Sequence, residues 1–497
     1  MDNKKVIGNK LWTMADNLRG KINLSDLKES LLGLYFYKFV SERFELFLES
    51  EYSEDTEIRA KNTLGYHIQP KYQFKNMVFE AKGSGPLLSD LQEAFTAIEN
   101  SASGKGKKVF KEIFSSFNFQ SNHGLDDEER SILISKILLT LSEIDFHLEN
   151  GFDIAIDGFE FLIDKFASSS GMRASDSYTP QNVSRILAKI VSMDKTSVRS
   201  VYDPACGTAS LLLSTSKEAD VTDFYGEELN EDIYRLALMN MIIHGVDFKN
   251  FDIQLGNSLE EPKHMDHKFE AIVSNPPFSA KWSASKKFLN DDRFKEYDMI
   301  PPRTKADYAF IQHMLNHLDK NGIMAAVMPN GVLYRGAIEG NIRKYMIEEL
   351  NVLDGVIGLP ENLYYSTSIP TVILIFKKSR EANEDIFFID ASKCYEQIRH
   401  YKKNIRDEDV NIIIGTYNGR KDINKFAKAV SLEDIRSNDY NLSIPRYIDT
   451  FEERESVDRE EIVNELRMID DEINEADVGI KKLGKQLGIN MPAFGGD

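Results

Sequence analysis

Between about residues 171 and 376, short apolar segments alternate with segments that have the spacing of amphipathic helices. This alternation limits the possible folds strongly, because parallel strands need crossover connections and helices are the usual ones. The predicted strands are residues 199–202, 224–226, 253–255, 271–274, 323–328, 353–357 and 371–376. We therefore expect an α/β fold with a mostly parallel, doubly wound sheet.

Small residues follow the first strand, in Asp203-Pro-Ala-Cys-Gly-Thr-Ala-Ser210. Ligands bind at the carboxyl ends of strands in such sheets, and a loop around Gly207 would let a ligand approach backbone amides. The loop is not G-x-G-x-x-G, so an uncharged or zwitterionic group is expected there rather than a pyrophosphate. Asp203 could equally cap the next helix. Cys206 is expected to be a small residue in a tight loop rather than a nucleophile.

Carboxylate and amide side chains follow the second and third strands. Glu228 ends the second strand, where an acidic side chain can accept both hydroxyls of a ribose. Glu227 is its direct competitor, because alternation along a strand turns only one of the two into the cleft. The alternative interpretation is a solvated pair of carboxylates at a strand end. Asn257 follows the third strand, where an amide could hold the edge of an adenine ring.

The fourth strand, residues 271–274, runs into Asn275-Pro-Pro-Phe278. The two prolines end the strand, since neither can donate a ladder hydrogen bond and both fix φ. An amide, a carbonyl and an aromatic ring at this edge suit a planar base with an exocyclic amino group. Taken alone, this segment could be only a turn. Four such features at successive strand ends favour a binding site.

Different patterns flank this central region. Residues 1–165 are expected to form a helical domain, because Leu27, Leu31, Tyr35 and Phe39 recur at helical spacing. Within it, residues 101–108 are predicted to be a flexible, basic loop. The sheet domain is expected to span residues 166–450.

Residues 451–497 are predicted to contain one helix with a heptad seam. Its apolar positions are Ile462, Leu466, Ile469, Ile473, Ala476, Ile480, Leu483 and Leu487. A helix packed on its own core would need a broader apolar face. The narrow seam therefore favours a coiled-coil or bundle helix that contacts a partner.

Charge and cysteine content exclude some functions. The net charge is −19, from 61 basic and 80 acidic residues, which counts against wide contact with phosphates by this chain alone. The two cysteines, Cys206 and Cys394, exclude a disulfide framework and a cysteine zinc site, and no metal is predicted. No apolar segment follows the first residues as in a signal peptide, so we expect a cytoplasmic protein.

Asp203-Pro-Ala-Cys-Gly-Thr208 and Asn275-Pro-Pro-Phe278, in this order, resemble the S-adenosylmethionine-dependent amino-methyltransferases of the DNA adenine-N6 branch. Along most of the chain, the sequence is similar to the modification (M) subunit of type I restriction-modification systems. The other stretches that carry this resemblance are Leu11-Trp12, Leu18-Arg19-Gly20, Ser177-Tyr-Thr-Pro180, Tyr234-Arg-Leu-Ala-Leu-Met-Asn240, Met328-Pro-Asn-Gly-Val-Leu333, Gly358-Leu-Pro360 and Asp439-Tyr-Asn-Leu-Ser-Ile-Pro445.

The resemblance implies a Rossmann-like methyltransferase sheet and a set of site residues. The residues implied to bind S-adenosylmethionine are Asp176, Ser177, Tyr178, Thr179, Pro180, Gln181, Asp203, Gly207, Thr208, Ala209, Glu228 and Asn257. Those implied to form the catalytic adenine site are Asn275, Pro276, Pro277 and Phe278. Asn257 stands where relatives often have Asp, and Asp176-Ser177 replaces the usual residues before Tyr178.

The resemblance also implies an activity and partners. The activity is site-specific methylation of adenine N6 in double-stranded DNA, with the target nucleotide flipped out. The implied partners are a specificity subunit that chooses the sequence, a second modification subunit and the restriction (translocase) subunit. Two alternatives stay open, namely methylation of glutamine or RNA bases and an assembly subunit without catalysis. The complete set of motifs argues against a decayed site.

Basic residues follow the Asn-Pro-Pro-Phe segment. They are Lys281, Lys286, Lys287 and Arg293. They could line the path of the DNA or close over the base, and a solvated loop is an equal alternative.

Overall fold

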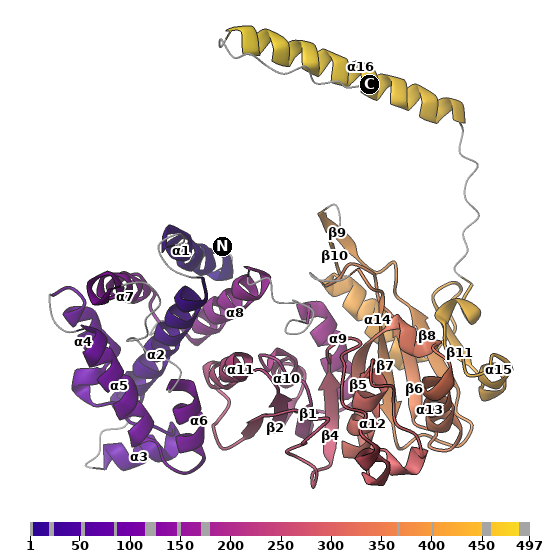
Figure 1. Ribbon diagram of the computed structural model, residues 1–497, viewed down its shortest axis with the longest axis horizontal. Helices are drawn as coiled ribbons and strands as arrows, with labels where there is room; N and C mark the ends of the chain where they lie inside the picture. The colour runs from indigo at the N-terminus through magenta and orange to yellow at the C-terminus, as the bar shows by residue number, and fades with distance from the viewer. Residues whose placement is uncertain are drawn as a thin grey trace. The chain divides into compact units, whose positions relative to one another are not determined.

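The computed structural model describes residues 3–18, 24–50, 55–83, 87–114, 126–146, 151–169, 179–364, 368–399, 402–449 and 459–486. The chain divides into two compact units, Met1–Ile448 and Asp449–Asp497, which are described separately below. The helices and strands are labelled in Figure 1.

The N-terminal part of the first unit is helical, as the sequence predicts. Its helices are α1 (Asn3–Leu18), α2 (Leu24–Ser50), α3 (Thr56–Thr63), α4 (Phe74–Glu80), α5 (Leu87–Ser101), α6 (Gly104–Phe114), α7 (Asp127–Ser142) and α8 (Gly151–Ser169). The predicted apolar face of α2 is buried throughout. The prediction of a flexible loop at residues 101–108 is wrong, because α6 begins at Gly104 and anchors itself through buried Val109 and Phe110.

A nine-stranded sheet forms the centre of the same unit, in the order β11-β8-β6-β7-β5-β4-β1-β2-β3. Its strands are β1 (Ser197–Asp203), β2 (Asp220–Glu228), β3 (Phe251–Leu255), β4 (Phe269–Ser274), β5 (Leu318–Pro329), β6 (Leu353–Gly358), β7 (Thr371–Lys377), β8 (Ile386–Asp390) and β11 (Ala427–Val430). Strands β3, β2, β1, β4 and β5 are parallel, whereas β7 runs antiparallel to β5 and β6. Every strand predicted from the sequence is present, and β8, β11 and the small pair β9 (Glu396–Arg399) and β10 (Lys402–Asn404) were not predicted.

Helices cover both faces of the sheet. They are α9 (Gln181–Val191), α10 (Ser210–Ser216), α11 (Glu231–Ile243), α12 (Asp307–His317), α13 (Ala337–Glu348), α14 (Asp407–Gly419) and α15 (Leu432–Ser437). Alternate residues of a strand enter different cores: Val201 packs with α9, α10 and α11, and Tyr202 packs with α12. The doubly wound α/β fold is thereby confirmed.

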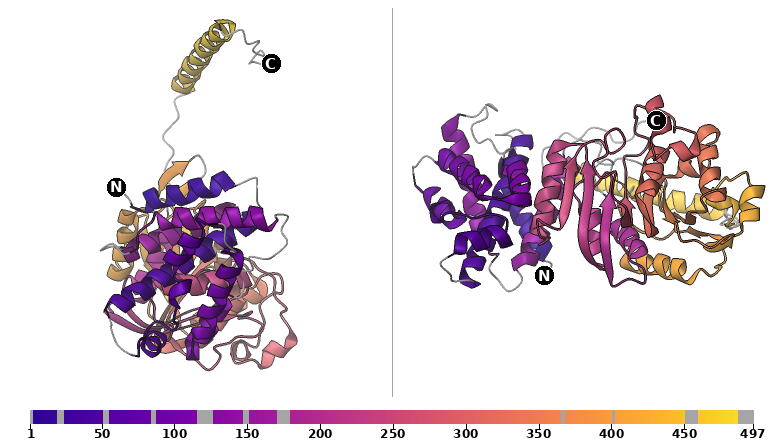
Figure 2. Two further views of the ribbon diagram at one scale, coloured as in Figure 1. Left: turned by 90° about the vertical axis from the view of Figure 1, so that its left-hand side faces the viewer. Right: turned by 90° about the horizontal axis from the view of Figure 1, so that it is seen from below.

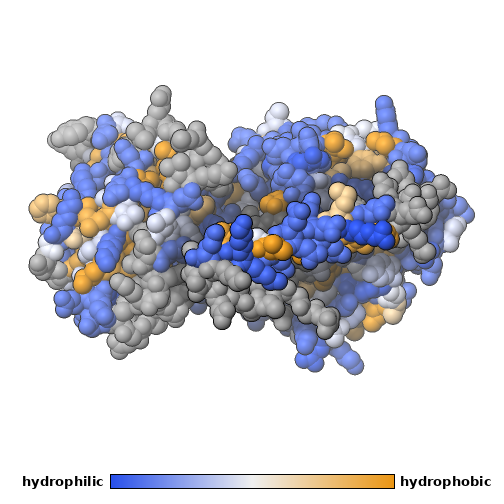
Figure 3. Space-filling model, turned by 90° about the horizontal axis from the view of Figure 1, so that it is seen from above, coloured by the Kyte–Doolittle hydropathy of each residue, from blue (hydrophilic) through white to orange (hydrophobic). Residues whose placement is uncertain are grey.

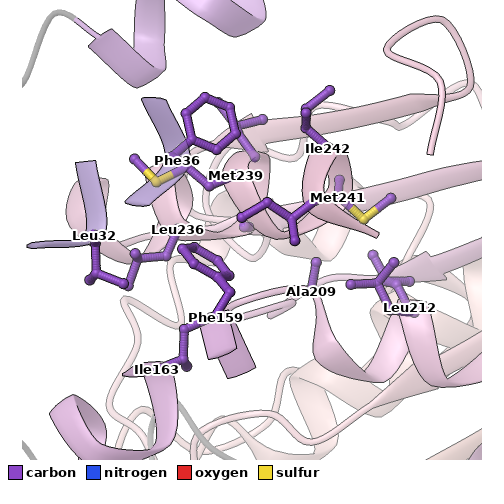
Figure 4. Packing of buried hydrophobic residues seen from close by; sticks show 14 of the residues in the cluster. Leu32, Phe36, Phe159, Ile163, Ala209, Leu212, Leu236, Met239, Met241 and Ile242 are labelled. Carbon is purple, nitrogen blue, oxygen red and sulfur yellow. The ribbon is translucent and has the colours of Figure 1, made fainter. Parts of the chain in front are cut away.

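The N-terminal helices share a hydrophobic core with the sheet. Helix α11 lies between them (Figures 1 and 2), and its Leu236 and Met239 belong to the same cluster as Phe36 of α2 and Phe159 of α8 (Figure 4). This core fixes the helical part against the face of the sheet that carries α10 and α11. The division at residue 165 stays a prediction.

The second unit contains the helix α16 (Arg459–Gln486), in the segment predicted to be helical. Its seam residues Leu466, Ile469, Ile473, Ile480 and Leu483 are between 42% and 58% exposed. Leu487 lies outside the described residues. The partner helix that the heptads predict is not tested by a single chain.

The surface shown in Figure 3 is largely hydrophilic, with hydrophobic residues in separate small groups among the coloured atoms. Within the described ranges, none of the helices is long and apolar enough to cross a membrane.

Candidate functional site

A cavity of about 610 Å³ opens at the carboxyl ends of the parallel strands. The strand order reverses between β1 and β4, which is where ligands bind in doubly wound sheets. Its wall is formed by Pro204, Ala205, Glu228, Leu229, Asn230, Ile233, Gly256, Asn257, Ser258, Leu259, Pro277, Ala280, Lys281, Trp282, Ala306 and Phe310. The cavity thus collects residues from all four strand ends that the sequence singled out.

The loop after β1 packs tightly over the end of β2. Gly207 has φ of +55° and Ala209 has φ of +62°, so the chain turns sharply before α10. Cys206 is buried, and its N–H donates to the carbonyl of Glu227 at 2.9 Å. Burial raises the pKa of the Cys206 thiol well above its usual value. This agrees with a packing role for Cys206 rather than a nucleophilic one.

Asp203 connects two strand ends. Its buried Oδ1 accepts hydrogen bonds from the Ala205 amide at 2.9 Å and from the Ser274 hydroxyl at 2.7 Å. Burial raises the pKa of Asp203 to about 7, although both hydrogen bonds act in the opposite direction. Because Ser274 directly precedes Asn275, this carboxyl fixes the segment after β4 relative to the loop after β1. Direct contact between Asp203 and a cofactor stays a prediction.

Glu228, and not Glu227, lines the cavity. Its Oε2 accepts the N–H of Gly207 at 3.0 Å, and its Oε1 accepts the N–H of Asn230 at 2.7 Å. Both carboxylate oxygens are therefore fixed by backbone amides at the rim. The sequence left open which of the two glutamates faces the cleft, and burial decides it.

Glu227 is fully buried beneath the cavity. Its Oε1 accepts the Tyr202 hydroxyl at 2.9 Å and lies 3.3 Å from His264 Nδ1, and its Oε2 accepts the N–H of Lys263 at 3.1 Å. Burial alone would lower the pKa of His264, but its hydrogen bonds to Asp252 and Glu227 outweigh burial and raise the pKa to about 8. Glu227 therefore belongs to a buried ionic network that supports the site.

Asn257 uses its side-chain oxygen within its own turn. Oδ1 accepts the N–H groups of Leu259 at 3.1 Å and of Glu260 at 3.2 Å. The residue lines the cavity, so its predicted contact with an adenine ring would be made by the amide nitrogen or by the neighbouring backbone.

Asn275 follows β4, and only one of its two polar side-chain atoms has a hydrogen-bond partner among the described residues. Its Nδ2 donates to the Thr179 hydroxyl at 3.0 Å, which orients the amide. Its Oδ1 is buried and has no hydrogen-bond partner among the residues that the structure describes. A buried acceptor without a partner costs about 1–3 kcal/mol, so its presence at this strand end calls for an explanation, and a bound ligand is one.

Phe278 is partly exposed and packs edge-on against Tyr364, with ring centroids 5.5 Å apart and an interplanar angle of 84°. Pro276 is buried between Asn275 and Phe278, and Pro277 lines the cavity. Of the four residues predicted to be catalytic, Pro277 thus lines the cavity and Asn275 contacts Thr179.

The predicted residues before α9 are only partly described. Asp176, Ser177 and Tyr178 lie outside the described residues. Thr179 meets Asn275, while Pro180 occupies the N-cap of α9 and Gln181 is exposed at its start. Thr208 is buried, and its carbonyl accepts the side-chain amide of Asn240 at 2.8 Å.

Both sequence interpretations of Arg293 are wrong. It is 1% exposed, and its guanidinium donates to the carbonyls of Ser258 and Leu259 at 3.0 Å each and pairs with Asp291. Arg293 thus supports the cavity wall from behind, because a buried guanidinium needs several acceptors. Lys281 lines the cavity, and Lys286 and Lys287 are exposed, so their contact with DNA stays a prediction.

Sequence reasoning missed Trp282 and Phe310, which form an apolar part of the wall. Trp282 is 6% exposed, stacks on Phe288 at 5.2 Å and donates its indole N–H to the carbonyl of Pro302 at 3.1 Å. The long interval between β4 and β5 gave no periodic signal that would have placed either ring. Among the described residues, no group of His, Cys, Asp and Glu has the arrangement of a metal site.

Family comparison agrees with this geometry. The family described as N-6 DNA Methylase matches residues 150–456, which include the whole cavity, and the HsdM N-terminal domain matches residues 7–140. The chain belongs to the N-6 DNA methylase family.

Relatives of this methylase carry consistent names. The type I restriction enzyme MpnII methylase subunit of Mycoplasma pneumoniae is 33% identical over 99% of this chain and 98% of its own length. The MjaVII methylase subunit of Methanocaldococcus jannaschii is 28% identical over 88% of this chain and 78% of its own. A solved type I methyltransferase subunit from Streptococcus thermophilus is 34% identical, with a TM-score of 0.82 over 90% of this chain and 100% of that one.

These comparisons confirm the resemblance to type I modification subunits that the sequence motifs indicated. They also confirm the class of activity, that of an adenine-specific DNA methyltransferase, and do not favour the alternatives. The individual site residues stay predictions that rest on the geometry above.

Proposed function

We propose that this methylase binds S-adenosylmethionine in the 610 Å³ cavity and transfers its methyl group to N6 of an adenine held by Asn275. S-adenosylmethionine supplies an electrophilic methyl group on a sulfonium. The observation that carries the proposal is the buried, unpartnered Oδ1 of Asn275 among the described residues, at the strand end beside the cavity.

The cavity residues suit a nucleoside with a zwitterionic tail. Glu228 presents a carboxylate that two backbone amides hold at the rim, in reach of ribose hydroxyls. The loop after β1 reaches the cavity through Pro204 and Ala205, and it carries no lysine or arginine that would favour a pyrophosphate. The N–H of Gly207 already donates to Glu228 and that of Ala209 to the carbonyl of Cys206, so these two amides would act by shaping the loop. Asp203 and Asn257 would act mainly by shaping their loops.

Asn275 and its neighbour would activate the amino group. The lone pair of adenine N6 is conjugated with the ring and is a poor nucleophile. If Asn275 Oδ1 and the Pro276 carbonyl accept the two N6 hydrogens, the nitrogen moves toward sp3 geometry and its lone pair turns toward the methyl group. The amide nitrogen of Asn275 donates to the Thr179 hydroxyl, which leaves the amide oxygen for the base.

Phe278 would stack on the flipped base. Extruding a nucleotide costs a few kcal/mol, and stacking on an aromatic ring returns about 1–3 kcal/mol. Tyr364 supports the ring edge-on and limits its rotation. Positioning of the base and exclusion of water then provide most of the acceleration.

Partners would supply sequence choice and much of the DNA contact. The net charge of −19 opposes broad binding to phosphates by this chain alone. The exposed heptad seam of α16 suits a helix of a specificity subunit, because knobs from Leu466, Ile469 and Ile473 need a facing helix. A second modification subunit and a restriction subunit complete the proposed assembly, in agreement with relatives that are named as subunits.

Transfer of tritiated methyl groups to DNA tests the proposal. Asn275→Ala should retain binding of S-adenosylmethionine by calorimetry, because the side chain is not part of the cavity wall, but should lose methylation by about 100-fold or more. Asn404→Ala, which removes an amide that donates to Glu396 outside the cavity wall, serves as the matched control. Methylation by Asn275→Ala at the wild-type rate would show that another group activates the base.

A further inference from the structure

The catalytic loop leaves the site through a disfavoured backbone conformation. Ser279, the residue after Phe278, has φ of +52°. This left-handed region is unfavourable for a residue with a Cβ, so it persists only where neighbouring groups hold it. The group that holds Ser279 therefore sets the direction in which Phe278 and Pro277 point.

Asp307 is that group. The N–H of Ser279 donates to Asp307 Oδ1 at 2.7 Å, and Asp307 is 1% exposed at the first position of α12. A charged acceptor makes a stronger hydrogen bond than a neutral one, and the start of a helix favours a carboxylate.

Arg335 neutralises and orients this buried carboxylate. Its guanidinium pairs with Asp307 Oδ2, and its Nε lies 2.8 Å from Oε2 of Glu339, which is 4% exposed. The carbonyl of Arg335 in turn accepts a hydrogen bond from Arg343 at 3.0 Å. Arg335 follows β5 and Glu339 lies on α13, so the carboxylate is braced from two further elements.

Backbone hydrogen bonds extend the same connection to the cavity wall. The N–H of Ala306 donates to the carbonyl of Ala280 at 2.8 Å, and the N–H of Trp282 donates to the carbonyl of Arg303 at 3.1 Å. Ala280, Trp282 and Ala306 all line the cavity. The start of α12 thus fixes both the exit of the catalytic loop and the wall beside it.

We propose that Asp307, braced by Arg335 and Glu339, is a positioning residue for methyl transfer. It touches neither substrate in the proposed mechanism; it holds Ser279 in the left-handed conformation and thereby keeps Asn275 and Phe278 aligned with the cavity. This inference rests on the proposed function and adds a role that the sequence motifs do not assign.

Paired substitutions separate positioning from general stability. Glycine adopts positive φ without penalty, so with Ser279→Gly the left-handed conformation depends less on the hydrogen bond to Asp307. In Asp307→Ala we expect kcat for methyl transfer to fall about 10- to 100-fold, with less than about a three-fold change in KM for S-adenosylmethionine. Adding Ser279→Gly should restore kcat by about five-fold or more without restoring the thermal unfolding midpoint.

The measurement uses the full chain, in the assembly in which the wild type methylates DNA. Asp307→Asn keeps an oxygen acceptor and should lose less activity than Asp307→Ala. Asp422→Ala is the matched control, because Asp422 Oδ1 accepts the N–H of Ala429 at 2.8 Å near β11, away from the cavity. That control should keep the wild-type kcat.

The outcomes distinguish this inference from the function on which it rests. Wild-type kcat in Asp307→Ala, or a kcat loss that Ser279→Gly leaves unchanged, overturns the positioning role while the Asn275 mechanism stands. If Asn275→Ala is as active as the wild type, the proposed function itself fails, and the catalytic meaning of Asp307 fails with it.

Discussion

The strand ends on the two sides of the cavity use their polar atoms in opposite ways. At the end of β2, both oxygens of Glu228 accept backbone N–H groups, and the oxygens of Glu227 are bonded in the interior. At the end of β4, Asn275 gives its nitrogen to Thr179 and keeps Oδ1 free of partners among the described residues.

The difference fits the roles proposed for the two strand ends. A group that binds an intact cofactor works best when it is already fixed, since less side-chain freedom is lost on binding. A group that must meet the reacting atom needs an unused acceptor in a site shielded from water. The residues at the end of β2 are therefore expected to govern the stability of the fold and the affinity for S-adenosylmethionine. The residues at the end of β4 are expected to govern the rate of methyl transfer.

The largest effect should come from Glu227. Glu227→Ala removes a buried partner of His264 and of the Tyr202 hydroxyl, and we expect the free energy of unfolding to fall by about 3–5 kcal/mol. Urea unfolding followed by circular dichroism measures it. Glu227→Gln keeps the shape and should lose less. A loss under about 1 kcal/mol in Glu227→Ala would mean that the network does not support the fold.

Glu228→Ala should act on binding instead. Loss of a charged acceptor at the rim is expected to weaken S-adenosylmethionine binding by about 10- to 100-fold. Calorimetry gives the affinity directly, and Glu218→Ala, in the turn between α10 and β2, is a suitable control because Glu218 lies outside the cavity wall. Unchanged affinity would remove Glu228 from the donor site.

The pH dependence of stability should report the buried His264. Its pKa is raised to about 8 in the folded state, so the folded protein binds a proton more tightly than the unfolded chain. This contribution is fully present below about pH 6.5 and is lost as the pH rises through about 8, a decrease of about 2 kcal/mol. His264→Gln should flatten the slope of unfolding free energy between these values. An equally steep slope in that variant would assign the effect to another group.

The smallest effect is expected at Thr179. Thr179→Val keeps the shape of the side chain but removes the acceptor that orients Asn275, and the rate of methyl transfer should fall about five- to ten-fold. Thr179→Ser, which keeps the hydroxyl, should remain near the wild-type rate. Single-turnover transfer from bound S-adenosylmethionine measures the step. Equal rates for the Val and Ser variants would show that Asn275 is oriented by something else.

Much of the candidate site could be predicted from the sequence, because its residues come directly after predicted strands. Glycine, acidic and amide residues after successive apolar segments predict one sheet edge, and the cavity does collect Glu228, Asn257 and Pro277 there. The sequence could not decide whether Glu227 or Glu228 faces the cavity. Alternation along β2 turns the two side chains to opposite faces of the sheet, but it does not show that His264 covers the face that carries Glu227. Nor could it assign Arg293, because one charged residue in a long loop has the same pattern whether it faces water or the carbonyls of Ser258 and Leu259.

By itself, the sequence determined the class of fold, the order of strands β1 to β7 along the chain and the residues that end the first four, because periodicity and proline placement are local properties. Only the tertiary structure decided which of those residues use their polar atoms in hydrogen bonds within the protein and which keep an atom available for a ligand. Asp307 shows this best: it is 28 residues from Ser279 in sequence, and only the packing of α12 against the segment after β4 brings its carboxylate to the Ser279 N–H.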